Sequence, residues 1–412
     1  MRVLYFSPRV CWPLISGAHL RDFYLARQLS QKATLTYFGL DSTGEAPLGT
    51  VSRDRLEALG NAEVRSIRRA PGYRLPNLVR GLIGPAPLNI LTYTSAPVMA
   101  ELERILHEQT FDAIQIEGVH LIAYARLIRQ VAPEARLICD WHNIESEILG
   151  RYAENDSNWL RHLYALRTAA LVRPLEDKLL HLCHAHTVCS ERERDVLLQR
   201  VPHTRIEVVG NGVDVEFFTA NPVHNGVRKD LVFMGRMDYH ANIDAALFFA
   251  KKIWPLVRAR RPELRFVVVG AQPTNEVLAL RDLAGVTVTG TVDDVRPFYQ
   301  SALAAVVPLR VGGGTRLKVL EAMAAGTPVI STTLGAEGLA VTTGKDILVA
   351  DSPEAMADTV ASLHAETPEW QGLVANGRTL VRKRYDWAVV GEVLLQLYAE
   401  QVEIGATCLG AS

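Results

Sequence analysis

Short apolar runs alternate with segments of helical periodicity along the first half of the chain. The first run, Val3–Phe6, is followed by a polar loop and by Ala18–Ser30, where leucines and aromatic residues recur at helical spacing. A second run, Leu35–Phe38, completes a strand–helix–strand unit. Later strands are expected at Val64–Arg69, Ala113–Ile116, Leu137–Cys139, Ala185–Cys189 and Ile206–Val209. This alternation predicts an α/β fold with a parallel sheet.

The intervening segments predict helices at Val98–Glu108, Leu121–Val131, Trp159–Cys183 with a kink at Pro174, and Ser190–Arg200 with Ser190 as its N-cap. The alternation restarts after a polar stretch, Asn221–Lys229. Strands are then expected at Leu231–Met234, Phe266–Val269, Val286–Thr289, Ala302–Val307 and Val329–Ser331. We therefore predict two α/β domains, residues 1–205 and 206–385, with a cleft between them.

A glycine-rich stretch, Pro308–Leu339, links one predicted strand to a helix in the second half. Gly312, Gly313 and Gly314 are followed by Thr315, Arg316 and, from Leu317, by helical spacing that Gly326 and Pro328 should end. Unpaired N–H groups and the positive end of the helix dipole would converge on this loop, which favours an anionic phosphate. Arg316 and Lys318 add charge, and Glu321 could accept hydrogen bonds from sugar hydroxyls. The alternative is an ordinary strand–helix turn with a surface Lys–Glu pair.

Polar residues also crowd the end of the predicted strand Leu137–Cys139. Asp140, Trp141, His142 and the residues up to Glu147 follow this strand. The carboxyl end of a strand is where ligands bind in open α/β sheets. We therefore assign His142 a functional role, with a structural histidine as the alternative. Ser16-Gly17, before the first helix, could bind phosphate or sugar, or could simply form a helix N-cap.

Net charge, cysteine usage and the absence of long apolar runs exclude several classes of protein. The 412 residues include 44 Lys+Arg and 45 Asp+Glu, so a net charge of −1 gives no sign of nucleic-acid binding. Five scattered cysteines, without a CxxC pair, suit a reducing cytoplasm and argue against a structural zinc site. The first residues are too short for a signal peptide, and no apolar run approaches a membrane span. Gly72–Asn89 is either a solvated loop with a short helix, which we favour, or a basic amphipathic segment at a membrane surface.

The order and spacing of several motifs resemble a GT-B glycosyltransferase of the large retaining family 4, over nearly the whole chain. They are the Ser16-Gly17 loop, His142, Asn211-Gly212-Val213-Asp214 with Phe217, Gly235-Arg236-Met237, Gly290-Thr291-Val292-Asp293 and Gly312–Gly338. The resemblance implies two Rossmann-like domains with parallel sheets facing across a cleft. It also implies that a C-terminal helix, residues 386–412, returns to the first domain.

The resemblance assigns donor-binding roles in the second domain. Glu321 would bind the ribose, and Arg236 the diphosphate of a sugar nucleotide. The family's other glutamate is replaced by Gly313, and the family's lysine after the Arg236 position is replaced by Asn242. We suggest that Lys318, together with Arg316, supplies the missing charge. The expected donor-binding segment comprises Gly313, Gly314, Thr315, Arg316, Leu317, Lys318 and Glu321, and Val292 would contact the base.

In the first domain the resemblance places His142 near the reactive carbon of the donor sugar, stabilising an oxocarbenium-like state, and Gly17 in a loop over the phosphate. The catalytic set is then His142, Arg236, Lys318 and Glu321. The implied reaction moves a sugar, with retention, from a UDP- or GDP-sugar to a glycan, lipid-linked or small-molecule hydroxyl.

The sequence has no convincing DxD site, because Asp214-Val215-Glu216 lies in the linker and Asp293-Asp294 suits a helix cap. We therefore expect no metal and no cofactor. From the cysteine usage and the first residues we expect a cytoplasmic enzyme, and peripheral contact with the inner face of the membrane is left open. The alternatives are a sugar-nucleotide epimerase or phosphorylase of the same fold, or an inactive nucleotide-binding module.

Overall fold

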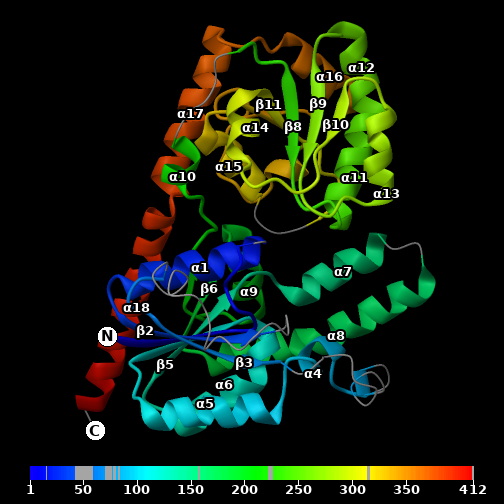
Figure 1. Cartoon of the computed structure of the whole chain (residues 1–412). Coiled ribbons are helices and arrows are strands. Elements are labelled where there is room, and N and C mark those ends of the chain that lie inside the picture. Colours follow the sequence, from blue (N-terminus) through cyan, green and yellow to red (C-terminus); the bar gives the residue numbers. More distant parts are fainter. Residues whose placement is uncertain are drawn as a thin grey trace. The chain divides into compact units, whose positions relative to one another are not determined.

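The computed structural model folds into two compact units, Met1–Gly210 with Val390–Ser412, and Asn211–Val389 (Figure 1). It describes residues 1–14, 16–41, 59–69, 77, 80–81, 84–155, 158–220, 226–312 and 316–410. Much of Gly72–Asn89, the loop or amphipathic segment of the sequence analysis, lies outside these residues. The predicted donor-site residues Gly313, Gly314 and Thr315 also lie outside them.

Unit 1 is built on a parallel sheet of order β3-β2-β1-β4-β5-β6-β7. The strands are β1 (Arg2–Ser7), β2 (Thr34–Asp41), β3 (Glu63–Arg68), β4 (Ala113–Glu117), β5 (Arg136–Trp141), β6 (Ala185–Val188) and β7 (Ile206–Val208). The central strands are buried along almost their whole length, because helices cover both faces of a parallel sheet. Glu117 and Asp140 are register partners at the carboxyl ends of β4 and β5.

The helices of unit 1 follow the strands in chain order. They are α1 (Gly17–Ser30), α4 (Leu88–Leu91), α5 (Ala96–Glu108), α6 (Ile122–Val131), α7 (Glu145–Asn155), α8 (Trp159–Leu182) and α9 (Glu191–Arg200). Ser16 caps α1 by accepting from the His19 N–H, and Ser190 caps α9, as predicted. The sequence did not predict α7, which pairs with α8 in a helical hairpin (Figure 1). Pro174 lies inside α8, which is assigned as one continuous helix.

The last helix, α18 (Trp387–Gly410), begins at the end of unit 2 and continues as part of unit 1. The Tyr398 hydroxyl donates to Gln115 Oε1 of β4 over 2.5 Å, with both residues buried. Arg136 at the start of β5 donates to Gln401 Oε1 over 2.9 Å. These contacts attach the C-terminal segment to the central strands of the first sheet.

Unit 2 has its own parallel sheet, of order β10-β9-β8-β11-β12-β13. The strands are β8 (Asp230–Met234), β9 (Arg265–Val269), β10 (Val286–Val288), β11 (Ala302–Val307), β12 (Val329–Ser331) and β13 (Leu348–Val349). The helices are α10 (Val215–Thr219), α11 (His240–Phe248), α12 (Trp254–Arg260), α13 (Asn275–Leu278), α14 (Arg296–Ser301), α15 (Leu317–Ala325), α16 (Pro353–Ser362) and α17 (Pro368–Arg384). Two Rossmann-like units with parallel sheets confirm the predicted α/β fold class.

The glycine-rich stretch folds as predicted where the structure describes it. β11 is buried at every position, and α15 begins at Leu317 and ends at Ala325. Gly326 follows with φ of 82°, a left-handed C-cap in which a side chain would also meet the guanidinium of Arg378. Val329–Ser331 then forms β12. Within the described residues, no helix is both long and apolar enough to span a bilayer.

Candidate active site

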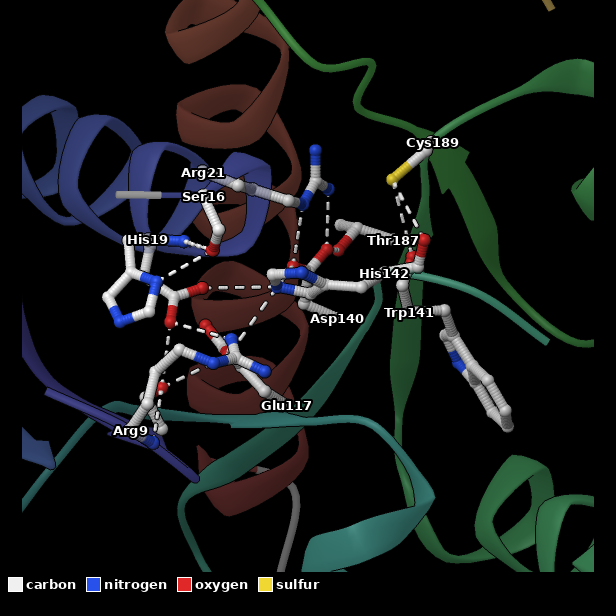
Figure 2. A network of polar contacts seen from close by, with 12 residues as sticks. Arg9, Ser16, His19, Arg21, Glu117, Asp140, Trp141, His142, Thr187 and Cys189 are labelled. Carbon is white, nitrogen blue, oxygen red and sulfur yellow. Dashed lines mark hydrogen bonds and ion pairs between the residues drawn. The ribbon is translucent and has the colours of Figure 1, made fainter. Parts of the chain in front are cut away.

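His142 lies beyond the carboxyl end of β5, among three buried carboxylates of unit 1 (Figure 2). Its Nε2 is 3.1 Å from Asp22 Oδ1, 3.4 Å from Glu117 Oε2 and 3.4 Å from Asp140 Oδ2. Glu117 and Asp140 end neighbouring strands, and Asp22 comes from the second turn of α1. The sheet edge where ligands bind in open α/β folds therefore carries an imidazole that faces acidic groups.

Ser7, the last residue of β1, and Arg9, in the loop after it, hold this group in place. Arg9 Nη1 donates to Asp22 Oδ2 over 2.8 Å and to Glu117 Oε2 over 3.0 Å. Ser7 Oγ lies within hydrogen-bond distance of the same two oxygens, at 2.9 and 3.1 Å. One guanidinium thus bridges two carboxylates that would otherwise repel each other.

The third carboxylate has its own cation. Arg21 of α1 donates from Nε to Asp140 Oδ2 over 2.8 Å and from Nη2 to Asp140 Oδ1 over 2.6 Å. The same guanidinium donates to the carbonyl of Gly210, at the end of the first part of unit 1. The hydroxyl of Thr187 on β6 also donates to Asp140. Both members of this pair have no solvent-exposed surface.

These contacts shift the pKa values in opposite directions. Burial disfavours a charged His142, but the carboxylates of Glu117 and Asp22 outweigh it and raise its pKa to about 9. Burial, together with the nearby charge of Asp22, raises the pKa of Glu117 to about 7. Burial also opposes ionisation of Asp22, but Arg9 and then His142 hold the pKa of that carboxyl far below its usual range. Near neutral pH the imidazole is therefore protonated, and Glu117 holds a proton for part of the time.

The arrangement defines what His142 can do. Nε2 faces the carboxylates, and no hydrogen bond to Nδ1 is found among the described residues. A protonated His142 can therefore donate from Nδ1 to a ligand while its Nε2 lies at ion-pair distance from Asp22. Three cations, Arg9, Arg21 and His142, face three carboxylates, so the group is close to neutral as a whole.

Asp22, Glu117 and His142 also have the chemistry of a metal site. One ligand atom from each lies within 4.8 Å of the others. However, the Arg9 guanidinium is bonded to both carboxylates and already supplies a positive charge there. The donor set therefore fits an internal ion network better than a divalent cation.

The Ser16-Gly17 pair lies at the start of α1, close in sequence to Arg21 and Asp22. Gly17 is the first residue of the helix, and Ser16 Oγ is 2.7 Å from His19 Nδ1 (Figure 2). The N-cap predicted as one alternative is present. A phosphate role for Gly17 stays a prediction.

In unit 2, the described part of the glycine loop is held from within. Gly312 has φ of 111°, a conformation that favours glycine. Arg316 is buried and donates to the carbonyls of Leu334 and Gly312, over 3.1 and 3.3 Å. At least part of its donor capacity is thus committed to the loop. Leu317 packs at the edge of the hydrophobic core of unit 2.

Lys318 lies in the first turn of α15 and points toward the start of α11. Its Nζ donates to Asn242 Oδ1 over 2.6 Å and lies 4.4 Å from the centre of the Phe233 ring. Burial lowers the pKa of Lys318 to about 7, although Glu321 partly opposes this. The ammonium therefore lies next to Asn242, which stands where the resembled family has its lysine.

Glu321 lies one turn further along α15. It accepts a hydrogen bond of 3.1 Å from the hydroxyl of Tyr299, a buried residue of α14. Burial raises the pKa of Glu321, while the Tyr299 hydrogen bond and then Lys318 oppose the rise. No salt bridge links Lys318 to Glu321 in the described part of the chain, so the simple surface-pair alternative does not describe them.

Arg236 follows β8 and is about two-fifths exposed. It donates to Asp238 from Nε and Nη2, and from Nη2 to Gln272 Oε1 over 2.7 Å. Asn242 donates to the Arg236 carbonyl, which ties this loop to α11. Val292, predicted to contact the base, is partly buried against the core of unit 2. Asn242 thus contacts both the Arg236 carbonyl and the Lys318 ammonium, so these three residues lie together at the loop after β8.

Two family models match this chain. "Glycosyltransferase Family 4" matches residues 50–217, and "Glycosyl transferases group 1" matches residues 228–366. The chain belongs to the GT-B glycosyltransferases. It is therefore a transferase.

Curated relatives support the same activity for the glycosyltransferase. A phosphatidyl-myo-inositol mannosyltransferase of Mycolicibacterium smegmatis is 27% identical over 343 residues, covering 80% of this chain and 83% of the relative. A D-inositol 3-phosphate glycosyltransferase of Frankia alni is 28% identical, covering 54% of this chain and 60% of the relative.

Solved structures share the GT-B fold at low sequence identity. Sucrose-phosphate synthase from Thermosynechococcus elongatus has a TM-score of 0.72 and 16% identity, with complete coverage of both chains. Anabaena Alr3699/HepE in complex with UDP has a TM-score of 0.67 and 15% identity, covering 97% of this chain and all of that one. At this identity the likeness shows the fold.

Sequence reasoning missed most of the network around His142. Arg9, Arg21, Asp22 and Glu117 were not singled out, although Asp140 was noted beside His142. One signal was available: Ser7, Glu117 and Asp140 each stand at the end of an apolar strand run, where side chains from neighbouring parallel strands gather.

Proposed function

We propose that this glycosyltransferase moves a sugar from a UDP- or GDP-sugar to a hydroxyl of a lipid-linked or sugar acceptor, with retention of the anomeric configuration. The observation that carries the donor half of the proposal is the group formed by Lys318 and Glu321 of α15 with Asn242 of α11. The group combines a cation, an amide and a carboxylate beside a glycine loop.

The chemistry needs fixed positive charge, because departure of a nucleoside diphosphate builds negative charge on its phosphates. Lys318 and Arg236 supply that charge in our proposal, together with the N–H groups at the start of α15. Glu321, held by Tyr299, would accept from the ribose hydroxyls. Leu317, Arg316 and the glycine loop would shape the phosphate site, and Val292 would lie against the base.

His142 contributes to the sugar half of the reaction in this proposal. Its protonated ring would donate from Nδ1 to a hydroxyl of the donor sugar and so orient the reactive carbon. In a retaining reaction of this kind the acceptor hydroxyl attacks from the leaving-group face, and the departing phosphate takes its proton. No further base is assigned.

Metal independence is part of the proposal. In unit 2 the lysine and arginine take the place of a divalent ion at the diphosphate. In unit 1 Arg9 already neutralises Asp22 and Glu117. Transfer should therefore persist in EDTA, and a strict requirement for Mg²⁺ or Mn²⁺ at constant ionic strength would contradict it.

The names of the relatives guide the acceptor class. One acts on a phosphatidyl-inositol and another on an inositol phosphate, while one fold neighbour was solved with UDP. We therefore favour a polyol or sugar hydroxyl carried on a lipid, reached from the cytoplasmic side of a membrane.

A donor panel tests the function directly. Purified protein would be screened for thermal stabilisation by UDP-, GDP- and ADP-sugars, and the best donor then incubated with phosphatidylinositol and with free sugars. We expect one donor to stabilise the protein and to transfer its sugar, with the product anomer matching the donor. An inverted product would reject retention, and the absence of any nucleotide binding would reject the donor class.

A further inference from the structure

The first half of α8 presents a row of large apolar side chains to solvent. Trp159 is 71% exposed, Leu163 58% and Leu166 43%. They are spaced by four and three residues, so they lie on one side of the helix. Leu160, beside this row, is 58% exposed. We call these four side chains the α8 face.

The α8 face differs from the other exposed apolar residues of the described chain. Most of those are far apart in sequence; Val227 and Leu283, for example, lie in loops and Ile404 lies on α18. Four large side chains within eight residues of one helix instead make a continuous patch. Apolar patches of this kind mark binding surfaces in soluble proteins.

The hairpin presents this face away from the sheet of unit 1. Figure 1 shows α7 and α8 meeting at an end that projects from the body of the unit, with the start of α8 at that end. Further along, Arg167, one turn after Leu163, donates to the carbonyls of Gly81 and Gly84, so its guanidinium is bound within the unit. Thr168 and Val172, on the opposite side of the helix from Trp159, are buried.

The charged side chains of α8 itself have one sign along this segment. Between Trp159 and Arg173 the ionised side chains are Arg161, Arg167 and Arg173, with His162 and without an aspartate or glutamate. Arg173 lies four turns after Trp159 and on the same side of the helix, and it is exposed. On the neighbouring helix α7, Glu154 is exposed, and of the arginines of α8 it is Arg173 that is exposed on the side of the α8 face. A row of apolar side chains with an exposed arginine on its own side complements an anionic phospholipid surface.

We propose that the α8 face inserts into the headgroup region of a bilayer that contains anionic phospholipids. This rests on the proposed function, because a lipid-linked acceptor must be reached at such a surface. The indole of Trp159 suits the membrane interface, the leucines enter the acyl boundary, and the arginines stay among the headgroups. The helix lies on the membrane in this arrangement and does not cross it.

Vesicle co-sedimentation tests the inference with the whole chain. The probes are vesicles of phosphatidylcholine alone and of phosphatidylcholine with phosphatidylglycerol. The protein should bind the mixed vesicles more strongly. Replacing the row by Trp159→Ser, Leu163→Ser and Leu166→Ser should lower the partition coefficient by about tenfold or more. Arg173→Glu should lower binding to the anionic vesicles alone, by about fivefold or more.

The matched control is Ile404→Ser, which removes an apolar side chain that is 46% exposed on α18. It should leave vesicle binding unchanged. Melting temperature and turnover of a water-soluble acceptor should be normal in the triple variant, because no proposed donor or sugar contact is altered. Vesicle binding does not depend on transfer, so a failure of the proposed function would leave this result readable.

Two outcomes would overturn the inference. One is equal vesicle binding by the wild type and the triple variant. The other is a wild-type dimer that the triple variant converts to monomer without any vesicle binding, since the α8 face would then belong to a second copy of the chain.

Discussion

Arg21 holds both carboxylate oxygens of Asp140 from a different element, with neither side chain exposed to solvent. The pair joins the first helix of the chain to β5, two residues before His142. If one member of a fully buried ion pair is removed, the other is left as an unpaired buried charge, which strongly destabilises the fold. The Arg21–Asp140 pair is therefore a support for the position of His142 as well as for the fold.

Removing one member should expose that dependence. Arg21→Met leaves Asp140 buried without its cation, and we expect a loss of about 3–5 kcal/mol in the free energy of unfolding. Arg21→Met with Asp140→Leu should recover part of that loss, because no unpaired charge remains. Urea unfolding of the single and double variants measures both. Equal losses in the two would show that the charge pair is not what stabilises this part of unit 1.

His142→Ala should separate catalysis from nucleotide binding. We expect kcat to fall about a hundredfold or more, since a donor to the reacting sugar is lost. Affinity for the nucleoside diphosphate should stay close to the wild-type value, because its proposed contacts lie in unit 2. The measurement is kcat per folded molecule beside the Kd for UDP or GDP.

His186→Gln is the matched control for that prediction. His186 is fully buried on β6 and accepts from the indole N–H of Trp141. The His186→Gln variant should be less stable than the wild type but should keep the wild-type kcat per folded molecule. A normal kcat in His142→Ala would remove His142 from the site.

Stability should fall as pH rises from about 6.5 to about 9. The folded-state pKa of His142 is raised to about 9, so its contribution is complete below its unfolded value of 6.5 and is lost through pH 9. Glu117, raised to about 7, adds a loss in the same direction between pH 4.5 and pH 7. The unfolding free energy should drop by about 3 kcal/mol over the histidine's range.

Denaturant unfolding at a series of pH values measures this slope. His142→Gln should flatten the profile between pH 7 and pH 9 while lowering stability at neutral pH. The same slope in both proteins would mean that other groups produce the pH dependence.

Binding of a nucleoside diphosphate should take up a proton above pH 7. The pKa of Lys318 is about 7 without ligand, so the amine is largely neutral at pH 8. Phosphate beside it favours the ammonium, which raises that pKa, and affinity should therefore decline as pH rises. Calorimetry in buffers of different ionisation enthalpy measures the uptake.

Lys318→Met should abolish that proton uptake. Arg236→Ala is the matched variant, because it should weaken binding by about 1.5–3 kcal/mol and leave the uptake in place. Uptake that persists without Lys318 would assign the proton to another group.

Glu321 should recognise ribose hydroxyls. Glu321→Gln keeps the shape and part of the hydrogen bonding, so it should weaken nucleotide binding less than Glu321→Ala. A 2′,3′-dideoxynucleoside diphosphate lacks the hydroxyls and should bind wild type and both variants with similar affinity. Equal affinity of all three proteins for the ordinary nucleotide would exclude Glu321 from the ribose site. Tyr299→Phe tests the hydrogen bond that orients the carboxylate.

Periodicity was enough to predict the fold class, for a physical reason. Buried parallel strands such as β11 are unbroken apolar runs, and the glycine and proline after α15 mark its end. The same reasoning missed α7, since Glu145–Asn155 is mostly polar and has few apolar residues to reveal its periodicity. Reasoning from the sequence also places arginines on the surface by default, and so it overlooked Arg21, which is fully buried.

The site was predictable only where one segment carries it. Arg316, Lys318 and Glu321 follow one another on a single stretch, so their spacing is readable. The network of His142 joins the ends of β1, β4 and β5 to α1, and no spacing rule connects Arg9 with Glu117. The partners of Lys318 and Glu321, Asn242 and Tyr299, are equally distant in sequence and required the folded chain.

The return of α18 to unit 1 sets the order in which the chain can fold during synthesis. Unit 1 includes Val390–Ser412, and Tyr398 completes a hydrogen bond to Gln115 in its central sheet. The ribosome must therefore translate all of Asn211–Val389 before the first unit receives its last helix, a delay of about 10–40 s at ordinary elongation rates. Unit 2, contiguous in sequence, can fold as soon as it emerges. The domain that is synthesised first is thus the one that is finished last, and a nascent chain stalled before residue 390 exposes the side of the first sheet that α18 covers.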